Sequence, residues 1–262
     1  MNQAVPILLY HRIDGSALST ATRPAVFRRH LQWLCERKWY ALGADEFTHL
    51  IRTGKPMPPR SFVITFDDGY ESIASAALPI LKEFNFPAIA FISTRLVLDT
   101  NAIANEGHEP HQAPAFLSWE QARALQSSGL IDLQSHSHAH KRFLDRPLAD
   151  IAEDLTTSVD ILSHQLDLPR SHFTHLAWPW GESKPAWRSA AMRAGFRYQY
   201  TVARRSFHAA TPLDEIPRTC FDAAAFPHFQ WQFWLQSGQL SSVWNAAYPY
   251  GRRLRQFANL LG

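Results

Sequence analysis

Residues 61–70 read Ser-Phe-Val-Ile-Thr-Phe-Asp-Asp-Gly-Tyr, an apolar run that ends in two adjacent carboxylates and a glycine. The β-branched and aromatic residues of this run are typical of a buried strand, and Gly69 permits a sharp turn at its end. Two neighbouring carboxylates repel each other unless a cation or a shared proton offsets their charge. Asp67 and Asp68 therefore predict a metal site with a spare base at the end of this strand.

The rest of the chain alternates between strand and helix patterns. Such alternation is typical of an α/β fold with a mostly parallel sheet. Because 46% of the 262 residues are hydrophobic, the chain can bury a full core, and we expect one domain over residues 1–262. The expected strands are residues 5–10, 61–66, 88–93, 130–135, 175–178, 197–203 and 213–218, and the expected helices are residues 24–38, 45–52, 72–84, 118–127, 151–166 and 187–193.

Charge and cysteine content exclude several classes of protein. The formal net charge is only +3 at pH 7, without a run of lysine or arginine, so we do not expect a nucleic-acid-binding protein. The two cysteines, Cys35 and Cys220, lie far apart and form no CxxC pair. Neither a disulfide framework nor a thiolate zinc site is indicated. The chemistry is therefore expected to come from oxygen and nitrogen ligands.

The beginning of the chain does not read as a targeting segment. Residues 1–10 carry no basic leader, and their apolar stretch is too short for the core of a signal peptide. No stretch of the sequence is long enough to span a membrane. The expected location is the cytoplasm.

Polar residues directly follow four of the expected strands. These are His11, the Asp67-Asp68 pair, the run His-Ser-His-Ala-His at 136–140, and the Trp-Pro-Trp-Gly turn at 178–181. The carboxyl ends of parallel strands share one rim, so these side chains are expected to converge. Two histidines spaced by four residues, together with one carboxylate, leave a zinc coordination position open. Taken singly, each motif is also compatible with a solvated turn.

Residues 65–69 and 136–140 resemble the two leading motifs of the polysaccharide deacetylase superfamily, the carbohydrate esterases with a NodB-homology domain. The likeness extends over residues 5–218. It implies a deformed (β/α) barrel and metal-dependent removal of acetyl groups from N-acetylated sugars. By this resemblance Asp67 corresponds to the general base, and Asp68, His136 and His140 correspond to the metal ligands. Zinc is the expected metal, with cobalt and nickel as alternatives.

The turn at 177–181 is similar to a family motif that ends in Pro-Tyr, lines the acetyl pocket and offers a backbone N–H to the oxyanion. Trp180 replaces the tyrosine here, and Leu176 stands where the family has an arginine. The resemblance thus implies a substrate and oxyanion role for Trp178, Pro179, Trp180 and Gly181 without a tyrosine hydroxyl. Something else must orient Asp67. Arg218, at the end of an expected strand, is the candidate, and an ordinary surface arginine is the alternative.

The family's last motif, Leu-x-His, supplies the general acid and normally lies near the C-terminus. Its match here is Leu9-Tyr10-His11, at the opposite end of the chain, which resembles the rearranged motif order of biofilm-polysaccharide deacetylases. A closed barrel makes its first and last strands neighbours, so one point in space can be reached from either end. His11 is therefore the expected acid, and a packing role in the core is the alternative.

Three functions are compatible with these residues. The leading hypothesis is a metal-dependent deacetylase acting on an N-acetylated polysaccharide or glycan precursor. The second is another hydrolase on the same scaffold, which would split an O-acetyl ester or a non-sugar amide. The third is a catalytically silent carbohydrate-binding relative, which the missing family arginine keeps open.

Two further regions carry open alternatives. Residues 222–262 are rich in aromatic side chains, followed by Arg252, Arg253 and Arg255; they predict a helical extension that covers the open side of the barrel. Sugar stacking or contact with a membrane surface is the alternative for this extension. The loop at 106–111 contains His108 and His111. We expect this loop to contact substrate or to be exposed to solvent, and a second metal site is the lesser alternative.

Overall fold

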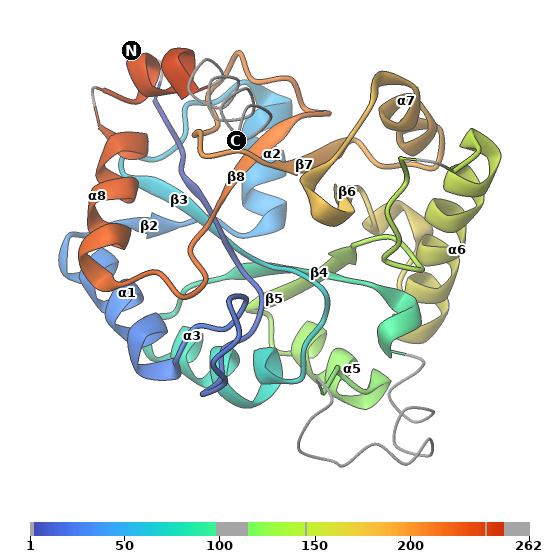
Figure 1. Ribbon diagram of the computed structural model, residues 1–262, viewed down its shortest axis with the longest axis horizontal. Coiled ribbons are helices and arrows are strands. Elements are labelled where there is room, and N and C mark those ends of the chain that lie inside the picture. Colours follow the sequence, from blue (N-terminus) through green and yellow to red (C-terminus); the bar gives the residue numbers. More distant parts are fainter. Residues whose placement is uncertain (1–2, 98–114, 145, 239, 249–262) are drawn as a thin grey trace, which may run out of the picture.

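The computed structural model describes residues 3–97, 115–144, 146–238 and 240–248. Eight strands form one sheet whose pairings between strands are all parallel (Figure 1). β1 pairs with both β8 and β3, so seven strands close a barrel, and β2 pairs with the first two residues of β3. This is the expected deformed (β/α) barrel. The strands are β1 (Ile7–Tyr10), β2 (Tyr40–Ala41), β3 (Ser61–Phe66), β4 (Ala88–Ile92), β5 (Ile131–Ser135), β6 (His175–Ala177), β7 (Tyr198–Val202) and β8 (Ile216–Cys220).

Both faces of the barrel strands are mostly apolar, because each strand packs against helices outside and against other strands inside. In β3, Phe62 and Ile64 join the cluster shared with the surrounding helices, whereas Val63 joins a second cluster inside the barrel. Successive side chains of a strand alternate between the two faces. On β8, Ile216 belongs to the inner cluster, so Arg218, two residues on, also points into the barrel.

The helices follow the pattern predicted from the sequence, with ends shifted by a few residues. α5 begins with a capping box, in which Ser118 and Gln121 each hydrogen-bond the other's backbone N–H. The expected helix over residues 72–84 is divided at Pro79: a π-helical turn over Ile73–Ala77 leads into α3, where Pro79 stands in the first turn and its missing N–H is tolerated. The helices are α1 (Pro24–Glu36), α2 (Ala44–Thr53), α3 (Leu78–Phe84), α5 (Trp119–Ser127), α6 (Leu148–Leu166), α7 (Pro185–Arg193) and α8 (Phe226–Ser237), with 3₁₀ turns at Arg170–His172 and Pro179–Gly181.

The strand predicted over residues 213–218 is present, but both of its predicted ends were wrong. β8 begins at Ile216 and runs to Cys220. Asp214 and Glu215 lie before it and pair instead with Arg188 on α7, at 3.0 and 2.7 Å. Because the strand ends later than expected, the rim of the barrel includes residues just beyond Cys220.

The aromatic region after β8 packs against the outside of the barrel. On α8, Phe229 stacks on His30 of α1 with ring centroids 4.0 Å apart, and Phe233 meets the edge of Trp39 at 4.7 Å. A further helix over residues 241–248 follows, and Asn245 on it hydrogen-bonds the backbone of Ser206. Tyr250, Arg252, Arg253 and Arg255 lie outside the described residues, as does the loop with His108 and His111.

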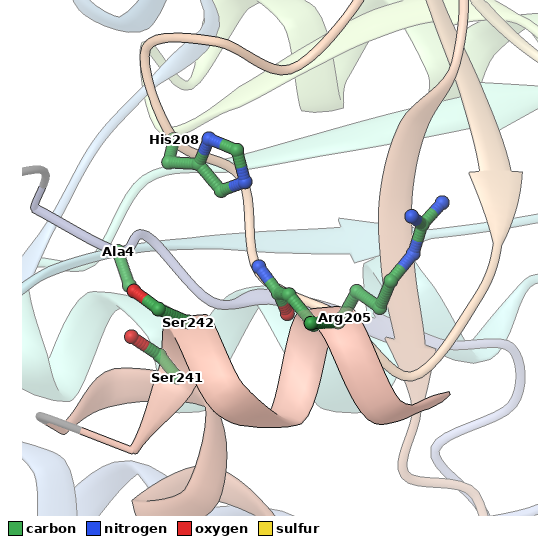
Figure 2. A pocket seen from close by; sticks show the side chains of 7 residues that line it. Ala4, Arg205, His208, Ser241 and Ser242 are labelled. Atoms are coloured by element: carbon green, nitrogen blue, oxygen red, sulfur yellow. The ribbon is translucent and has the colours of Figure 1, made fainter. Parts of the chain in front are cut away.

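A pocket lies between this last helix and the loop that precedes β8. Arg205, His208, Ser241 and Ser242 line it together with Ala4 (Figure 2). Ala4 precedes β1, so this pocket belongs to the amino end of the barrel strands, away from the predicted site residues. Among the described helices, none is long and apolar enough to cross a membrane.

Candidate metal centre and active site

The predicted metal ligands come together at the carboxyl end of the barrel. Oδ1 of Asp68, after β3, lies 3.0 Å from Nε2 of His140 and 3.3 Å from Nε2 of His136, both of which follow β5. Asp67 lies one step further away, with its Oδ2 3.8 Å from Nε2 of His136. The adjacent carboxylates therefore occupy different places: Asp68 faces both imidazoles, and Asp67 stands beside them.

Unusual backbone conformations form the two turns that carry these side chains. Asp68 and Gly69 have φ angles of 72° and 90°, and Ser137 and His140 have φ angles of 67° and 51°. Left-handed residues other than glycine are uncommon and persist where the surrounding structure holds them, often at functional sites. The turn after β5 is held by the buried carboxylate of Asp154 on α6, which accepts hydrogen bonds from the backbone N–H groups of residues 138 and 139 at 2.9 and 3.2 Å.

The orientation of His136 leaves one ring nitrogen available for a metal. Its Nδ1 lies 2.8 Å from the carbonyl oxygen of Ala177, which can only accept a hydrogen bond. The proton is therefore on Nδ1, and Nε2 presents its lone pair toward Asp68. A hydrogen bond of this kind orients a metal-binding histidine and fixes its tautomer.

The three side chains fit a divalent metal ion. Their donor atoms all lie within 4.8 Å of one another. Oδ1 of Asp68 is buried and makes no hydrogen bond within the described part of the chain. Burial alone would raise the pKa of Asp68, but the imidazoles of His136 and His140 hold this pKa well below its ordinary value, so the group is a carboxylate. One carboxylate and two imidazoles are a common donor set for zinc and similar metals, and they leave a position open.

Asp67 is held by a buried arginine. Its two carboxylate oxygens accept hydrogen bonds from Nη1 and Nη2 of Arg218 at 2.6 and 2.7 Å. Arg218 is fully buried inside the barrel, with its guanidinium over the ring of Phe91, so it is not a surface arginine. Burial would raise the pKa of Asp67, but the charge of Arg218 outweighs it and lowers this pKa. The carboxylate is thereby ionised and fixed in direction.

Replacing Arg218 by methionine should destabilise the fold strongly, because it leaves the carboxylate of Asp67 buried and unpaired. Breaking one half of a buried pair typically costs about 3–5 kcal/mol of unfolding free energy. Urea denaturation of the metal-free protein measures this loss. The double variant R218M/D67N should regain part of it, since the unpaired charge is gone. Equal stability of Arg218→Met and the unmodified protein would contradict the energetic role of this pair.

His11 is paired with an acidic residue that the sequence analysis missed. Asp222 accepts a hydrogen bond from the backbone N–H of His11 at 3.0 Å, and its other oxygen lies 2.5 Å from Nδ1 of the ring. Burial would lower the pKa of His11, but the hydrogen bond and charge of Asp222 outweigh it and raise this pKa well above its ordinary value. The side chain is 20% exposed, which is more than a core-packing role requires. A signal for Asp222 was present, since it is an acidic residue just after a strand.

The turn after β6 presents one tryptophan to the site and buries the other. Trp178 is fully buried and donates a hydrogen bond from its indole N–H to Gln199. Trp180 is 56% exposed, and its ring centroid lies 5.6 Å from that of His140. Pro179 is buried, and a side chain on Gly181 would meet the backbone nitrogen of Val202 at 2.6 Å. The turn is thus tightly fixed, and Trp180 lies beside His140, one of the predicted metal ligands.

Comparison with known proteins identifies relatives with the same fold. Residues 54–199, more than half of the chain, match the family model for polysaccharide deacetylase. The solved structure of IcaB from Ammonifex degensii superposes with a TM-score of 0.74 at 22% identity, covering 89% of this chain and 97% of that one. The deacetylase PplD of Streptococcus pyogenes in complex with acetate gives 0.74 at 20% identity, covering 88% and 98%.

Several curated relatives carry the name poly-beta-1,6-N-acetyl-D-glucosamine N-deacetylase. The one from Escherichia coli K12 is 29% identical over 132 residues, which is 49% of this chain but only 20% of that protein. The one from Staphylococcus epidermidis is 27% identical over 208 residues, or 76% of this chain and 68% of that protein. The match to the family model decides the classification: this chain belongs to the polysaccharide deacetylase family.

Proposed function

We propose that this protein is a metal-dependent hydrolase that removes acetyl groups from the N-acetylated sugars of a polysaccharide or glycan precursor. The observation that carries the proposal is that two adjacent carboxylates have different partners. Asp68 faces two imidazoles, whereas Asp67 is held by Arg218 beside them. The N-deacetylase relatives make poly-β-1,6-N-acetylglucosamine the first substrate to test.

The proposed metal ligands are Asp68, His136 and His140, and zinc is the expected ion, with cobalt and nickel as alternatives. When bound, such an ion acts as a Lewis acid toward the acetyl carbonyl and makes a water molecule more acidic. Trp180 lies beside His140 with ring centroids 5.6 Å apart, and the charge of His11 acts on Asp68, so the acetyl group is expected to bind on the side of these two residues.

The chain's own residues supply the proton transfers. Asp67 accepts a proton from the water as its oxygen attacks the carbonyl carbon, and Arg218 keeps the carboxylate ionised and aimed. The backbone N–H of Trp180 donates a hydrogen bond to the oxyanion. His11, kept protonated by Asp222, then gives its proton to the sugar nitrogen as the carbon–nitrogen bond breaks. Acetate and a free amino sugar result.

An acetate-release assay on matched substrates tests this proposal. Oligomers of β-1,6-linked N-acetylglucosamine should release acetate in a metal-dependent reaction, and O-acetylated, N-unsubstituted analogues should react far more slowly. A preference for the O-acetyl compounds would favour the esterase alternative. Binding of both metal and oligomer without any acetate release would favour a catalytically silent carbohydrate-binding protein.

Asp222→Asn should move the basic limb of the pH profile of kcat/KM to lower pH. Asp222 raises the pKa of His11, and removing its charge leaves burial to lower that pKa. His11 must be protonated to act as an acid, so activity should then be lost at a lower pH than in the unmodified protein. Asp14→Asn is the matched control. It makes the same chemical change near His11 in the sequence, but the carboxylate of Asp14 pairs with Arg12 and not with His11. An unshifted basic limb in the Asp222 variant would exclude His11 as the acid.

We also infer that the aromatic C-terminal region contacts a membrane surface. Trp231 and Trp234 on α8 are each 54% exposed, and Val243 on the next helix is 65% exposed. The sequence that follows carries Arg252, Arg253 and Arg255. Exposed indoles together with basic residues favour an anionic lipid interface.

Liposome sedimentation with W231S/W234S tests the membrane contact. Loss of two partly inserted indoles should weaken binding to anionic vesicles by about tenfold or more. Met192→Ser, which removes another exposed apolar side chain from α7, should bind as the unmodified protein does. Unchanged sedimentation of the double variant would rule out this contact, and weaker retention on glycan alone would assign the indoles to sugar stacking.

A further inference from the structure

A second cluster of metal-binding side chains lies at the same rim and shares no residue with the first. It contains His11 after β1, Cys220 at the end of β8, and Asp222 two residues beyond. One nitrogen, one sulfur and one oxygen from these residues lie within 4.8 Å of one another. Sγ of Cys220 lies 3.2 Å from Oδ2 of Asp222, the same oxygen that contacts Nδ1 of His11. The three groups thus converge around one carboxylate oxygen.

We propose that His11, Cys220 and Asp222 form a second metal site, selective for a thiophilic divalent cation such as zinc, and that its occupation inhibits the enzyme. The absence of a CxxC pair argued against a thiolate zinc site in the sequence. The barrel nevertheless brings His11, from the opposite end of the chain, and Asp222, from beyond the strand end, next to Cys220.

The donor set and its geometry suit zinc. Zinc takes thiolate, imidazole and carboxylate ligands at about 2.0–2.3 Å, so donor atoms of a tetrahedral site lie roughly 3.5 Å apart. The spacing of Cys220 to Asp222 is already close to this value, and the His11 to Asp222 contact must widen by roughly 1 Å, which a small rotation of the partly exposed imidazole supplies. The thiolate distinguishes this site from the Asp68 site and disfavours magnesium or manganese.

Binding at this site would displace two protons that are otherwise retained. Burial raises the pKa of the Cys220 thiol, so the thiol stays protonated and unreactive in the absence of a metal. The cation displaces that proton, and it also displaces the proton that His11 shares with Asp222. The imidazole must be neutral to bind, so His11 loses the acidic proton of its imidazolium form. The inhibition rests on the proposed function of His11, whereas the metal site itself does not.

Cobalt titration tests the site without any activity measurement. Cys35, the other free cysteine, is exposed, so the experiments use a Cys35→Ser background. A thiolate ligand gives Co²⁺ a charge-transfer absorption in the near ultraviolet. We expect this band on binding of a second equivalent, and we expect C35S/C220S to bind one equivalent without it. In C35S/H140A, which lacks a ligand of the first site, the band should still appear. No thiolate band in either Cys220-containing protein would overturn the proposal.

Inhibition by excess zinc tests the consequence for catalysis. Each variant's acetate-release rate at excess zinc is divided by its own rate at one equivalent. In C35S this ratio should be about 0.01 or less, because loss of a general acid typically lowers the rate about 100-fold or more. In C35S/C220S the ratio should stay near one. An equal fall in both proteins would overturn the inhibitory role. If neither protein releases acetate, the proposed function fails, and the cobalt spectrum still decides the metal site.

Discussion

Asp67→Asn is expected to abolish acetate release while leaving the metal content of the purified protein unchanged. An amide cannot take the proton from the attacking water, and loss of a general base typically lowers the rate by about 10²–10⁴-fold. The metal should remain because Asp67 stands outside the donor set: Asp68, and not Asp67, lies 3.0 Å from Nε2 of His140. The measurements are the acetate-release rate and the metal-to-protein ratio by elemental analysis.

Asp68→Asn is the matched control for this experiment, because it makes the same chemical change one residue along the chain. It removes the negative donor of the His136 and His140 site, so the metal of that site and the activity should both be lost. Metal loss of equal size in the two variants would contradict the assigned roles. Retained turnover in Asp67→Asn would show that another group activates the water.

The convergence of residues could be predicted from the sequence where each short motif is recognisable by its residue types and spacing alone. Asp67 and Asp68 end a strand whose apolar character is visible in the sequence, and His136 and His140 lie within one turn after another strand. Their convergence required only that parallel strands share a rim. The barrel then brings Asp68 within 3.3 Å of both imidazoles.

Pairings between distant strands were harder to predict. The arginine that orients Asp67 is visible only when the inward-facing positions of β8 are known, because Arg218 lies 151 residues from its partner. Leu176, where the family has an arginine, belongs instead to the apolar cluster shared with the helices. Asp222 was missed because the expected strand ended at Arg218, and the true strand continues to Cys220. An error of two residues at one strand end thus hid the partner of His11.

His140→Ala is expected to lose the metal of the Asp68, His136 and His140 site, and turnover with it, while keeping the fold. The side chain is 21% exposed and lies at the rim, so its removal leaves no large cavity in the core. The remaining carboxylate and imidazole are a poor site for a divalent ion. The affinity for zinc should therefore fall by more than the 10–100-fold that typically follows loss of a residue supporting a ligand. Competition with a chromogenic chelator measures that affinity, and circular dichroism checks the fold.

Asp154→Asn provides the comparison that separates a ligand from its support. Asp154 touches no predicted donor atom but holds the turn of His140 through two backbone N–H groups. Its replacement should weaken zinc binding by about 10–100-fold, less than the loss in His140→Ala. With Cys220→Ser added to both variants, so that excess zinc does not inhibit, added zinc should then restore turnover in the Asp154 variant at a concentration that does not restore it in the His140 variant. The reverse order of affinities would mean that the turn, and not the imidazole of His140, is what the metal requires.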